Sequence, residues 1–208
     1  MRAPRDPDNR MTTTAQPKHK LPLLLWPPNL LGYVRVLTLI AAMGEADSSS
    51  SYAVWMLTIS LVLDYFDGPC ARHLGMCSQF GDLLDHYTDH VTMMWLVWVT
   101  AGTGIGGQTN LAISAIHNGV AFVYMALRGH YFKHSERGNL VTRTIEANNY
   151  WNFASMLYCA NCILLPLLKL SFASTYSMQP REVSTPLVDL ADALGAGVTL
   201  SYSLAVWL

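Results

Sequence analysis

A group of carboxylates with helical spacing is the part of the sequence best suited to chemistry. The 26 residues from Asp64 to Asp89 read DYFDGPCARHLGMCSQFGDLLDHYTD and hold five of the 14 acidic residues of the chain. Asp64 and Asp67 are three positions apart, and Asp85 and Asp89 are four apart, so each pair lies on one face of its own helix. Two helices that face each other would bring these four carboxylates together.

Four carboxylates at one point form a strongly anionic site with only oxygen ligands. Such ligands suit hard divalent cations, Mg²⁺ or Mn²⁺, whereas zinc favours Cys and His. Two cations would neutralise the four charges and leave room for a phosphate ligand. We therefore predict a site for one or two Mg²⁺ or Mn²⁺ ions at Asp64, Asp67, Asp85 and Asp89.

Residues between the two pairs suit a phosphate ligand. Gly68 lets a ligand approach the backbone closely, Arg72 carries the planar guanidinium that pairs with phosphate, and Ser78 adds a hydroxyl. Gly81, one turn before Asp85, keeps a bulky side chain out of the site. The pattern predicts a metal-bridged diphosphate. The alternative is a solvated loop in which the acids only cap helices, and the apolar surroundings argue against it, because polar residues beside lipid need partners.

The same stretch resembles the signature of the CDP-alcohol phosphatidyltransferases, D-x-x-D-G-x-x-A-R-x8-G-x3-D-x3-D. Every fixed position is satisfied at the expected spacing, by Asp64, Asp67, Gly68, Ala71, Arg72, Gly81, Asp85 and Asp89. Within the family the chain is most similar to eukaryotic phosphatidylinositol synthases. The similar pieces are PNLLGYVR (28–35), LDYFDG (63–68) and SQFGDLLDHYTD (78–89), with weaker similarity in ALRG (126–129) and GNLVTR (138–143).

The resemblance implies an enzyme that transfers the phosphatidyl group of CDP-diacylglycerol to myo-inositol and releases phosphatidylinositol and CMP. It also implies an all-α integral membrane fold of six transmembrane helices, usually a homodimer, with two metal ions at the cytosolic helix ends. Asp64, Asp67 and Asp85 would hold one ion, and Asp64, Asp85 and Asp89 the other. Asp89 would also be the catalytic general base. The residues that would contact the CDP part are Gly68, Arg72 and Ser78.

Three positions depart from the inositol pattern. The inositol enzymes place Arg after the last motif Asp, where this chain has His90; Ser114 stands where a fourth-span Asp is expected; and Thr144 to Asn149 lack a tyrosine pair and a further Arg. The acceptor therefore stays open between inositol, glycerol 3-phosphate and serine, or diacylglycerol with CDP-choline or CDP-ethanolamine. A non-catalytic lipid- or metal-binding relative is the other alternative, and the presence of Arg72 and Asp89 argues against it.

The composition places these residues in a membrane protein. Of the 208 residues, 51% are hydrophobic and 13% are charged, against about 25% charged in soluble domains. The net charge of -1 provides no basic field for nucleic acid. Six apolar segments are candidate membrane spans, at 26–43, 52–63, 83–100, 111–127, 150–170 and 187–208. The second and third reach the bilayer length of about 20 residues only if the polar stretch between them is also helical.

Basic residues give the orientation. We expect residues 1–20 to form a flexible cytosolic tail and residues 21–208 to form a six-helix membrane catalytic domain. Ten of the 13 basic residues lie in this tail, at Arg72 or after the fourth span, whereas the connections on the opposite side hold Lys169 and Arg181. The positive-inside rule therefore turns the Asp-rich stretch to the cytosol, and kinship favours the endoplasmic reticulum. The chain stops at Leu208 in an apolar run, which leaves open a flush last helix or a missing tail.

Two residues of the first span are expected to close the site. Arg35 lies inside that span, and the motif acids are its natural partners, with Asn29 beside it. Arg143 either binds the acceptor or is an ordinary positive-inside arginine.

Two further patterns have simpler interpretations. Asp82, His86 and His90 follow one another at four-residue steps. They form either an extra metal site or, as we favour, a polar edge of the third helix that faces the cavity or a dimer partner. The glycines from Gly102 to Gly107 predict a flexible turn between the third and fourth spans.

Overall fold

The computed structural model describes residues 22–45, 51–130, 153–183 and 185–207, and these residues contain helices and no strand. The all-helical prediction is therefore confirmed for this part of the chain. The long elements are α1 (Pro27–Gly44), α2 (Ser51–Leu74), α3 (Gln79–Thr100), α4 (Ile105–Arg128), a continuous run of α6 (Phe153–Cys159), η4 (Ala160–Leu164) and α7 (Leu165–Tyr176), and α8 (Pro186–Trp207). Two short 3₁₀ turns are η2 (Leu23–Leu25) and η5 (Pro180–Glu182).

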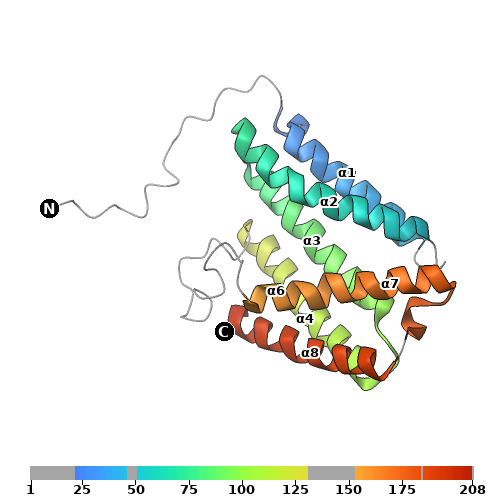
Figure 1. Ribbon diagram of the computed structural model, residues 1–208. Helices are drawn as coiled ribbons and strands as arrows, with labels where there is room; N and C mark the ends of the chain where they lie inside the picture. The colour runs from blue at the N-terminus through green and yellow to red at the C-terminus, as the bar shows by residue number, and fades with distance from the viewer. Residues whose placement is uncertain (1–21, 46–50, 131–152, 184, 208) are drawn as a thin grey trace.

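Helix α3 joins two pairs of helices, α1 with α2 and α4 with α8. In Figure 1, α1 and α2 lie side by side in one half of the molecule, and α7, α4 and α8 occupy the other half. Helix α1 packs along α2 and α4 packs along α8, while α3 contacts α1, α4 and α7. The larger apolar core lies where α1, α2, α3 and α7 meet, and it includes Leu39, Leu57, Leu96 and Leu170. The polar beginning of α3 lies beside α1 and α2.

Local sequence signals explain where the helices near the Asp-rich stretch begin and end. Pro27 opens α1, where its missing N–H has no intrahelical partner to lose. The turn between α2 and α3 contains Gly75 at φ +64°, a left-handed conformation that glycine adopts at little cost. Ser78 then caps α3, because its Oγ accepts a hydrogen bond from the Gly81 N–H at 3.0 Å. The polar stretch is therefore helical on both sides of one short turn.

The polar stretch between the second and third predicted spans is helical apart from one short turn, as the length of these two spans required. Helix α2 continues through Asp64 to Leu74, and α3 already begins at Gln79. Among the residues that the structure describes, two helices are long and apolar enough to cross a membrane by length and composition: Ile105–Arg128, with a mean hydropathy of 1.3, and Met156–Tyr176, with 1.6. The count of six transmembrane spans remains a prediction.

The glycine-rich turn is shorter than predicted. Gly106 and Gly107 belong to α4. A Cβ on Gly106 would lie 3.0 Å from the Ala193 backbone nitrogen of α8, and a Cβ on Gly107 would lie 2.7 Å from the Gly102 carbonyl oxygen. Gly106 therefore allows α4 to pack closely against α8, and Gly107 allows the preceding turn to lie closely against α4, which the prediction of a flexible turn missed.

Lys169 was expected on a connection, and that expectation is wrong. Lys169 lies within α7, is buried, and donates to both carboxylate oxygens of Asp192 on α8 at 2.7 Å. Next to this pair, Asn161 of the π-helical turn η4 donates to Thr199 Oγ1 at 2.8 Å and to Asn110 Oδ1 at 3.0 Å. These contacts join α4, α7 and α8 through buried polar groups. Predictions for residues 1–20, Arg143 and 144–149 lie outside the described residues.

Candidate functional site

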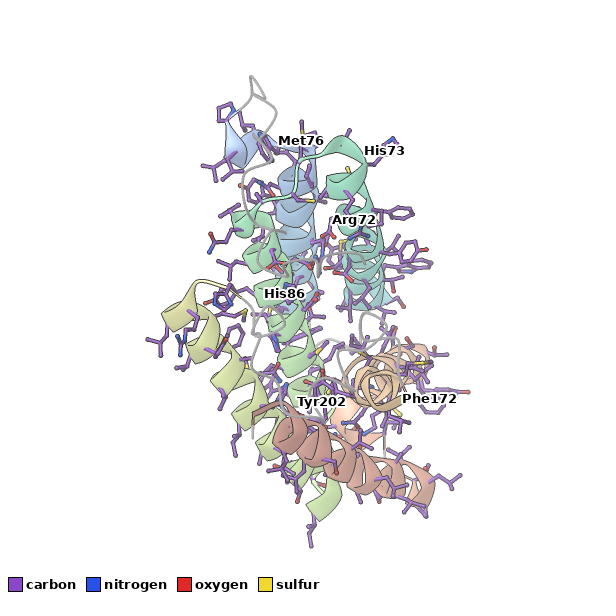
Figure 2. All side chains as sticks on the ribbon, turned by 90° about the vertical axis from the view of Figure 1, so that its left-hand side faces the viewer. Arg72, His73, Met76, His86, Phe172 and Tyr202 are labelled. Atoms are coloured by element: carbon purple, nitrogen blue, oxygen red, sulfur yellow. The ribbon has the colours of Figure 1, made fainter. Side chains whose placement is uncertain are left out.

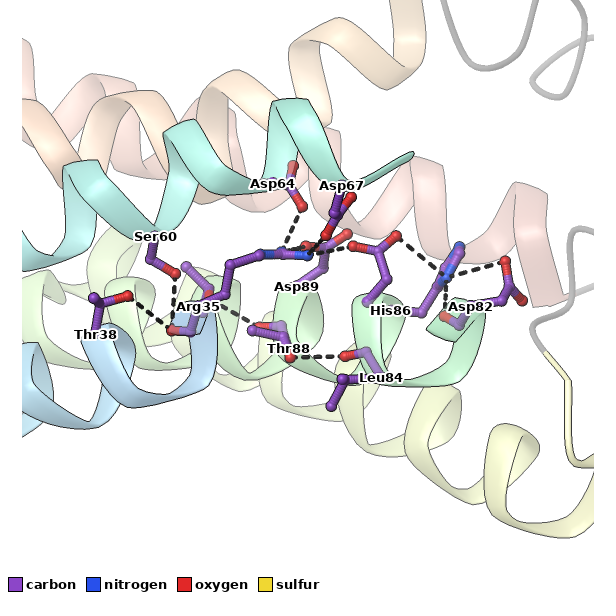
Figure 3. Close-up of polar contacts among 12 residues, drawn as sticks. Arg35, Thr38, Ser60, Asp64, Asp67, Asp82, Leu84, His86, Thr88 and Asp89 are labelled. Carbon is purple, nitrogen blue, oxygen red and sulfur yellow. Dashed lines mark hydrogen bonds and ion pairs between the residues drawn. The ribbon is translucent and has the colours of Figure 1, made fainter. Parts of the chain in front are cut away.

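One arginine connects all four motif aspartates. The Arg35 guanidinium reaches from α1 between α2 and α3 (Figure 3). Its Nη1 donates to Asp67 Oδ2 at 2.8 Å and also contacts Asp85 Oδ1. Its Nη2 donates to Asp89 Oδ1 at 2.7 Å and also contacts Asp64 Oδ1. The predicted pairing of Arg35 with the motif acids is therefore present, and the two helices bring all four carboxylates to one cation.

The carboxylates converge as their spacing predicts, although not equally. Ligand oxygens of Asp64, Asp67 and Asp85 lie within 4.8 Å of one another. Asp89 is one turn further along α3, and Arg35 links its carboxylate to the other three. The four acids therefore form one cluster between α2 and α3, with Asp64, Asp67 and Asp85 as its closest group.

This donor set fits the metal ions that the sequence predicts. Its ligands are carboxylate oxygens only, which suits Mg²⁺ or Mn²⁺ better than zinc. Each aspartate places one oxygen on Arg35 and retains a second oxygen. Four carboxylates against one guanidinium leave a formal charge of -3 in the cluster, so its electrostatics favour further cations.

A cavity of about 230 Å³ opens beside the carboxylates. Its walls come from the beginning of α1, the end of α2 and the beginning of α3. The lining includes Asn29, Asp67, Gly68, Arg72, Ser78, Gly81, Asp85 and His86. Figure 2 shows Arg72 and Met76 toward one end of the molecule, with His86 nearer its middle, whereas Tyr202 lies in the other half. The cavity therefore brings two of the predicted metal ligands, Asp67 and Asp85, together with the residues predicted to bind CDP.

Arg72 supplies a cation to this cavity. Its side chain lines the cavity, and among the described residues no carboxylate forms an ion pair with it. A Cβ on Gly68 would lie 3.3 Å from Arg72 Nη1, so the missing side chain at Gly68 leaves space for the guanidinium. Arg72 is thus placed to pair with an anionic ligand in the cavity.

The start of α3 forms the opposite wall. Ser78 lines the cavity while its Oγ accepts the Gly81 N–H, so its hydroxyl proton is still available for a ligand. A Cβ on Gly81 would lie only 2.7 Å from Asn29 Oδ1. Asn29 itself donates to the Leu23 carbonyl at 2.7 Å. Gly81 therefore allows Asn29 of α1 to approach α3, a purpose that the sequence did not reveal.

The residue after the last motif aspartate faces another helix. His90 is buried, and its Nδ1 lies 2.6 Å from Asn118 Oδ1 on α4. Since the Asn118 amide nitrogen donates to the Ser114 carbonyl, its oxygen is the acceptor and His90 is the donor. Ser114 is also buried at this contact between α3 and α4. His90 and Ser114 therefore serve helix packing, and an extra metal site at Asp82, His86 and His90 has no geometric support.

His86 lines the cavity, at a position for which the sequence left two interpretations open. Its Nδ1 lies 2.7 Å from the Asp82 carbonyl and 3.8 Å from Asp85 Oδ2. The favoured interpretation of a polar helix edge facing the cavity therefore agrees with its position. Leu84, Met76 and Cys77 also line the cavity, and nothing in their residue types indicated this.

Comparisons with known proteins agree with this geometry. The profile of the CDP-alcohol phosphatidyltransferase family matches residues 25–169, which include every residue of the cluster. The chain is similar to the human CDP-diacylglycerol–inositol 3-phosphatidyltransferase, with 35% identity over 75 residues, 36% of this chain and 35% of that protein. The Saccharomyces cerevisiae enzyme of the same name is 34% identical over 67 residues, 32% of this chain and 30% of that enzyme.

A plant relative is similar to the chain with about the same identity and coverage. The probable CDP-diacylglycerol–inositol 3-phosphatidyltransferase 2 of Arabidopsis thaliana is 35% identical over 77 residues, which cover 37% of this chain and 34% of the relative. The matched stretches thus span about a third of each of these proteins. No solved structure matches the chain. Because the family profile covers well over half of its length, the chain belongs to the CDP-alcohol phosphatidyltransferase family.

Proposed function

We propose that this protein transfers the phosphatidyl group of CDP-diacylglycerol to myo-inositol and forms phosphatidylinositol and CMP. The observation that carries the proposal is the convergence of four motif aspartates beside a cavity lined by Arg72, which forms an ion pair with no carboxylate in the described part of the chain. Family membership supports phosphatidyl transfer to an alcohol. The names of the similar human, yeast and plant proteins support inositol as the acceptor.

The cavity would hold the nucleotide part of the donor lipid. Arg72 would pair with the diphosphate, while Gly68 and Ser78 would contact the CDP part from the ends of α2 and α3. Asp64, Asp67, Asp85 and Asp89 would bind two Mg²⁺ or Mn²⁺ ions. Bound there, the ions would neutralise charge on the diphosphate and on the attacking and leaving oxygens.

Asp89 would act as the general base. A hydroxyl oxygen of inositol would attack the lipid-side phosphorus and form the new P–O bond, while its proton passes to the Asp89 carboxylate. The bond between this phosphorus and the oxygen of CMP would break, and CMP would leave with the electron pair. Asp89 lies outside the closest group of three carboxylates, those of Asp64, Asp67 and Asp85, which supports a role for it beyond metal binding.

The surroundings of the enzyme follow from the same kinship. We propose that it is an integral membrane protein, with two apolar helices long enough to cross a bilayer. Six transmembrane helices, a site facing the cytosol and a location in the endoplasmic reticulum agree with the distribution of basic residues and with the eukaryotic relatives. A homodimer is proposed from the family alone.

An acceptor panel tests the substrate. Purified protein with CDP-diacylglycerol and Mn²⁺ would be given myo-inositol, glycerol 3-phosphate or serine in separate reactions, and CMP release would be measured. A separate reaction would combine CDP-choline with diacylglycerol. We expect inositol to support the fastest release, at least about tenfold above the others, a difference of 1.4 kcal/mol in the barrier. Faster release with another acceptor would reassign the substrate but retain the reaction.

A further inference from the structure

Arg35 is more than a neutralising partner of the aspartates. We propose that Arg35 is a permanent positioning residue of the metal site, which holds one oxygen of each of the four aspartates and leaves the second oxygen of each for the cations. The inference rests on the metal site of the proposed function. It adds that the geometry of this site depends on an arginine outside the carboxylate motif.

The pattern of contacts is the first argument. Nη1 of Arg35 contacts Asp67 of α2 and Asp85 of α3, and Nη2 contacts Asp64 of α2 and Asp89 of α3. Each amino group thus bridges one carboxylate from each helix. The planar guanidinium fixes the angle between its amino groups, so it sets the distance between the two bridged pairs. A flexible or monodentate cation would not do this.

The exposed fractions of the side chains show on which side of the cluster Arg35 lies. The Arg35 side chain is 3% exposed, whereas the side chain of Asp67 is 13% exposed and those of Asp64, Asp85 and Asp89 are 38%, 33% and 34% exposed. The arginine is therefore the most buried member of the cluster, and three of the four carboxylates remain about one third exposed. Asp67 and Asp85 line the cavity and Arg35 does not, so cations that enter from the cavity meet these two carboxylates first and have no need to displace the guanidinium.

The backbone of Arg35 is fixed to the same helices. Its carbonyl oxygen accepts hydrogen bonds from Ser60 Oγ at 3.2 Å and from Thr38 Oγ1 at 2.9 Å. Ser60 is buried on α2, one turn before Asp64. Nearby, a Cβ on Gly32 would lie 2.8 Å from Leu84 Cδ2 of α3, so α1 and α3 are also in close contact. The guanidinium therefore extends from a rigid junction of three helices.

Positioning by Arg35 and simple competition between Arg35 and the metal ions predict opposite effects of removing this arginine on metal binding. If Arg35 only substituted for absent ions, its removal would free the ligands and strengthen metal binding. If it positions the ligands, its removal leaves four carboxylates that repel one another and lose their common orientation. Removing such supporting groups from metal sites typically weakens metal affinity about 10- to 100-fold.

The affinity for Mn²⁺, measured without any lipid substrate, distinguishes these two roles of Arg35. Wild-type protein, Arg35→Gln and the control Asn161→Ala would be titrated with Mn²⁺, and free Mn²⁺ would be measured by electron paramagnetic resonance. Asn161 is a buried polar residue of η4 that contacts none of the aspartates. We expect Arg35→Gln to bind Mn²⁺ about 10- to 100-fold more weakly and Asn161→Ala to bind like wild type, although its melting temperature falls.

Unchanged or tighter Mn²⁺ binding by Arg35→Gln would overturn the positioning role while leaving the proposed reaction intact. Absence of Mn²⁺ binding in wild type would overturn the metal site and this inference together. If Arg35→Gln does not fold, Arg35→Lys replaces it, since one ammonium cannot bridge both pairs, and the same loss of affinity is expected.

A measurement on the wild-type protein gives independent support. With ¹⁵N-labelled arginine, an Arg35 guanidinium held at both amino groups rotates slowly and gives separate Nη signals, assigned by their absence from Arg35→Lys. These signals should persist at saturating Mg²⁺. Their collapse into one averaged signal on adding Mg²⁺ would show that the ions displace Arg35, and would contradict the proposal.

Discussion

Arg35 Nη2 donates a hydrogen bond to Asp89 Oδ1 at 2.7 Å, across 54 positions of the chain. This contact links the first helix to the carboxylate proposed as the general base. It also connects Asp89 to the other three aspartates, whose ligand oxygens lie within 4.8 Å of one another. Metal binding and proton acceptance therefore depend on one hydrogen-bonded unit.

Asp89→Asn tests the role of the base. The amide is nearly isosteric with the carboxylate but cannot take a proton from an alcohol. We expect CMP release to fall about 10²- to 10⁴-fold, the usual contribution of a general base, while the melting temperature stays near that of wild type. Synthesis of phosphatidylinositol at a rate close to wild type would exclude Asp89 as the base.

Arg72→Lys tests the phosphate contact. Lysine retains the charge but lacks the planar fork that binds two phosphate oxygens. We expect the KM for CDP-diacylglycerol to rise, by about tenfold for each 1.4 kcal/mol of binding lost. The KM for inositol should change little. A selective rise in the inositol KM would instead place Arg72 on the acceptor side.

Gly81→Ala tests the close approach of α1 and α3. The new methyl group would lie 2.7 Å from Asn29 Oδ1, closer than van der Waals contact allows. We expect a loss of about 1 to 3 kcal/mol in the free energy of unfolding, as in other overpacked sites. Gly119→Ala is the matched control, because nothing lies within 4 Å of a Cβ at this helical glycine of α4.

The control variant should be neutral or stabilising, by up to about 1 kcal/mol, because alanine favours helices over glycine. Thermal unfolding in detergent measures both variants. Equal stability changes for Gly81→Ala and Gly119→Ala would mean that Asn29 moves away at no cost, and that the described contact has no structural importance.

Lys169→Met tests the buried ion pair in the other half of the molecule. Without its partner, Asp192 would remain buried and unpaired, which typically costs about 3 to 5 kcal/mol. The double variant Lys169→Met/Asp192→Leu should recover most of this loss, since both charges are removed. Folded protein should retain its CMP release, because neither residue lines the substrate cavity. No recovery in the double variant would contradict this account of the pair.

The motif spacing was sufficient to predict that the four aspartates lie close together. Residues at i and i+3 or i+4 share a helix face, so the pairing of Asp64 with Asp67 and of Asp85 with Asp89 follows from helical periodicity. The partnership of Arg35 followed from charge, because an arginine in an apolar span needs acids. What periodicity did not supply was the contact of one guanidinium with all four, since that depends on how α1 packs against two other helices.

Other features depended on tertiary packing and could not be predicted. The spacing of His90 on α3 is compatible with the cavity edge, yet its side chain bonds Asn118 of α4. The position of Lys169 near the end of an apolar run suggested a connection, but a buried carboxylate 23 positions later holds it inside α7. In both cases the deciding partner belongs to a helix that the local sequence does not identify.

Metal-dependent CMP release tests the central claim most directly. Purified protein, stripped of metal by a chelator, would be given CDP-diacylglycerol and myo-inositol, and CMP would be measured before and after adding Mn²⁺, beside the variant Asp85→Asn. We predict no release without Mn²⁺, inositol-dependent release with it, and little release from Asp85→Asn under either condition. Release that is unaffected by the chelator, or equal in Asp85→Asn and wild type, would contradict phosphatidyl transfer at the four aspartates.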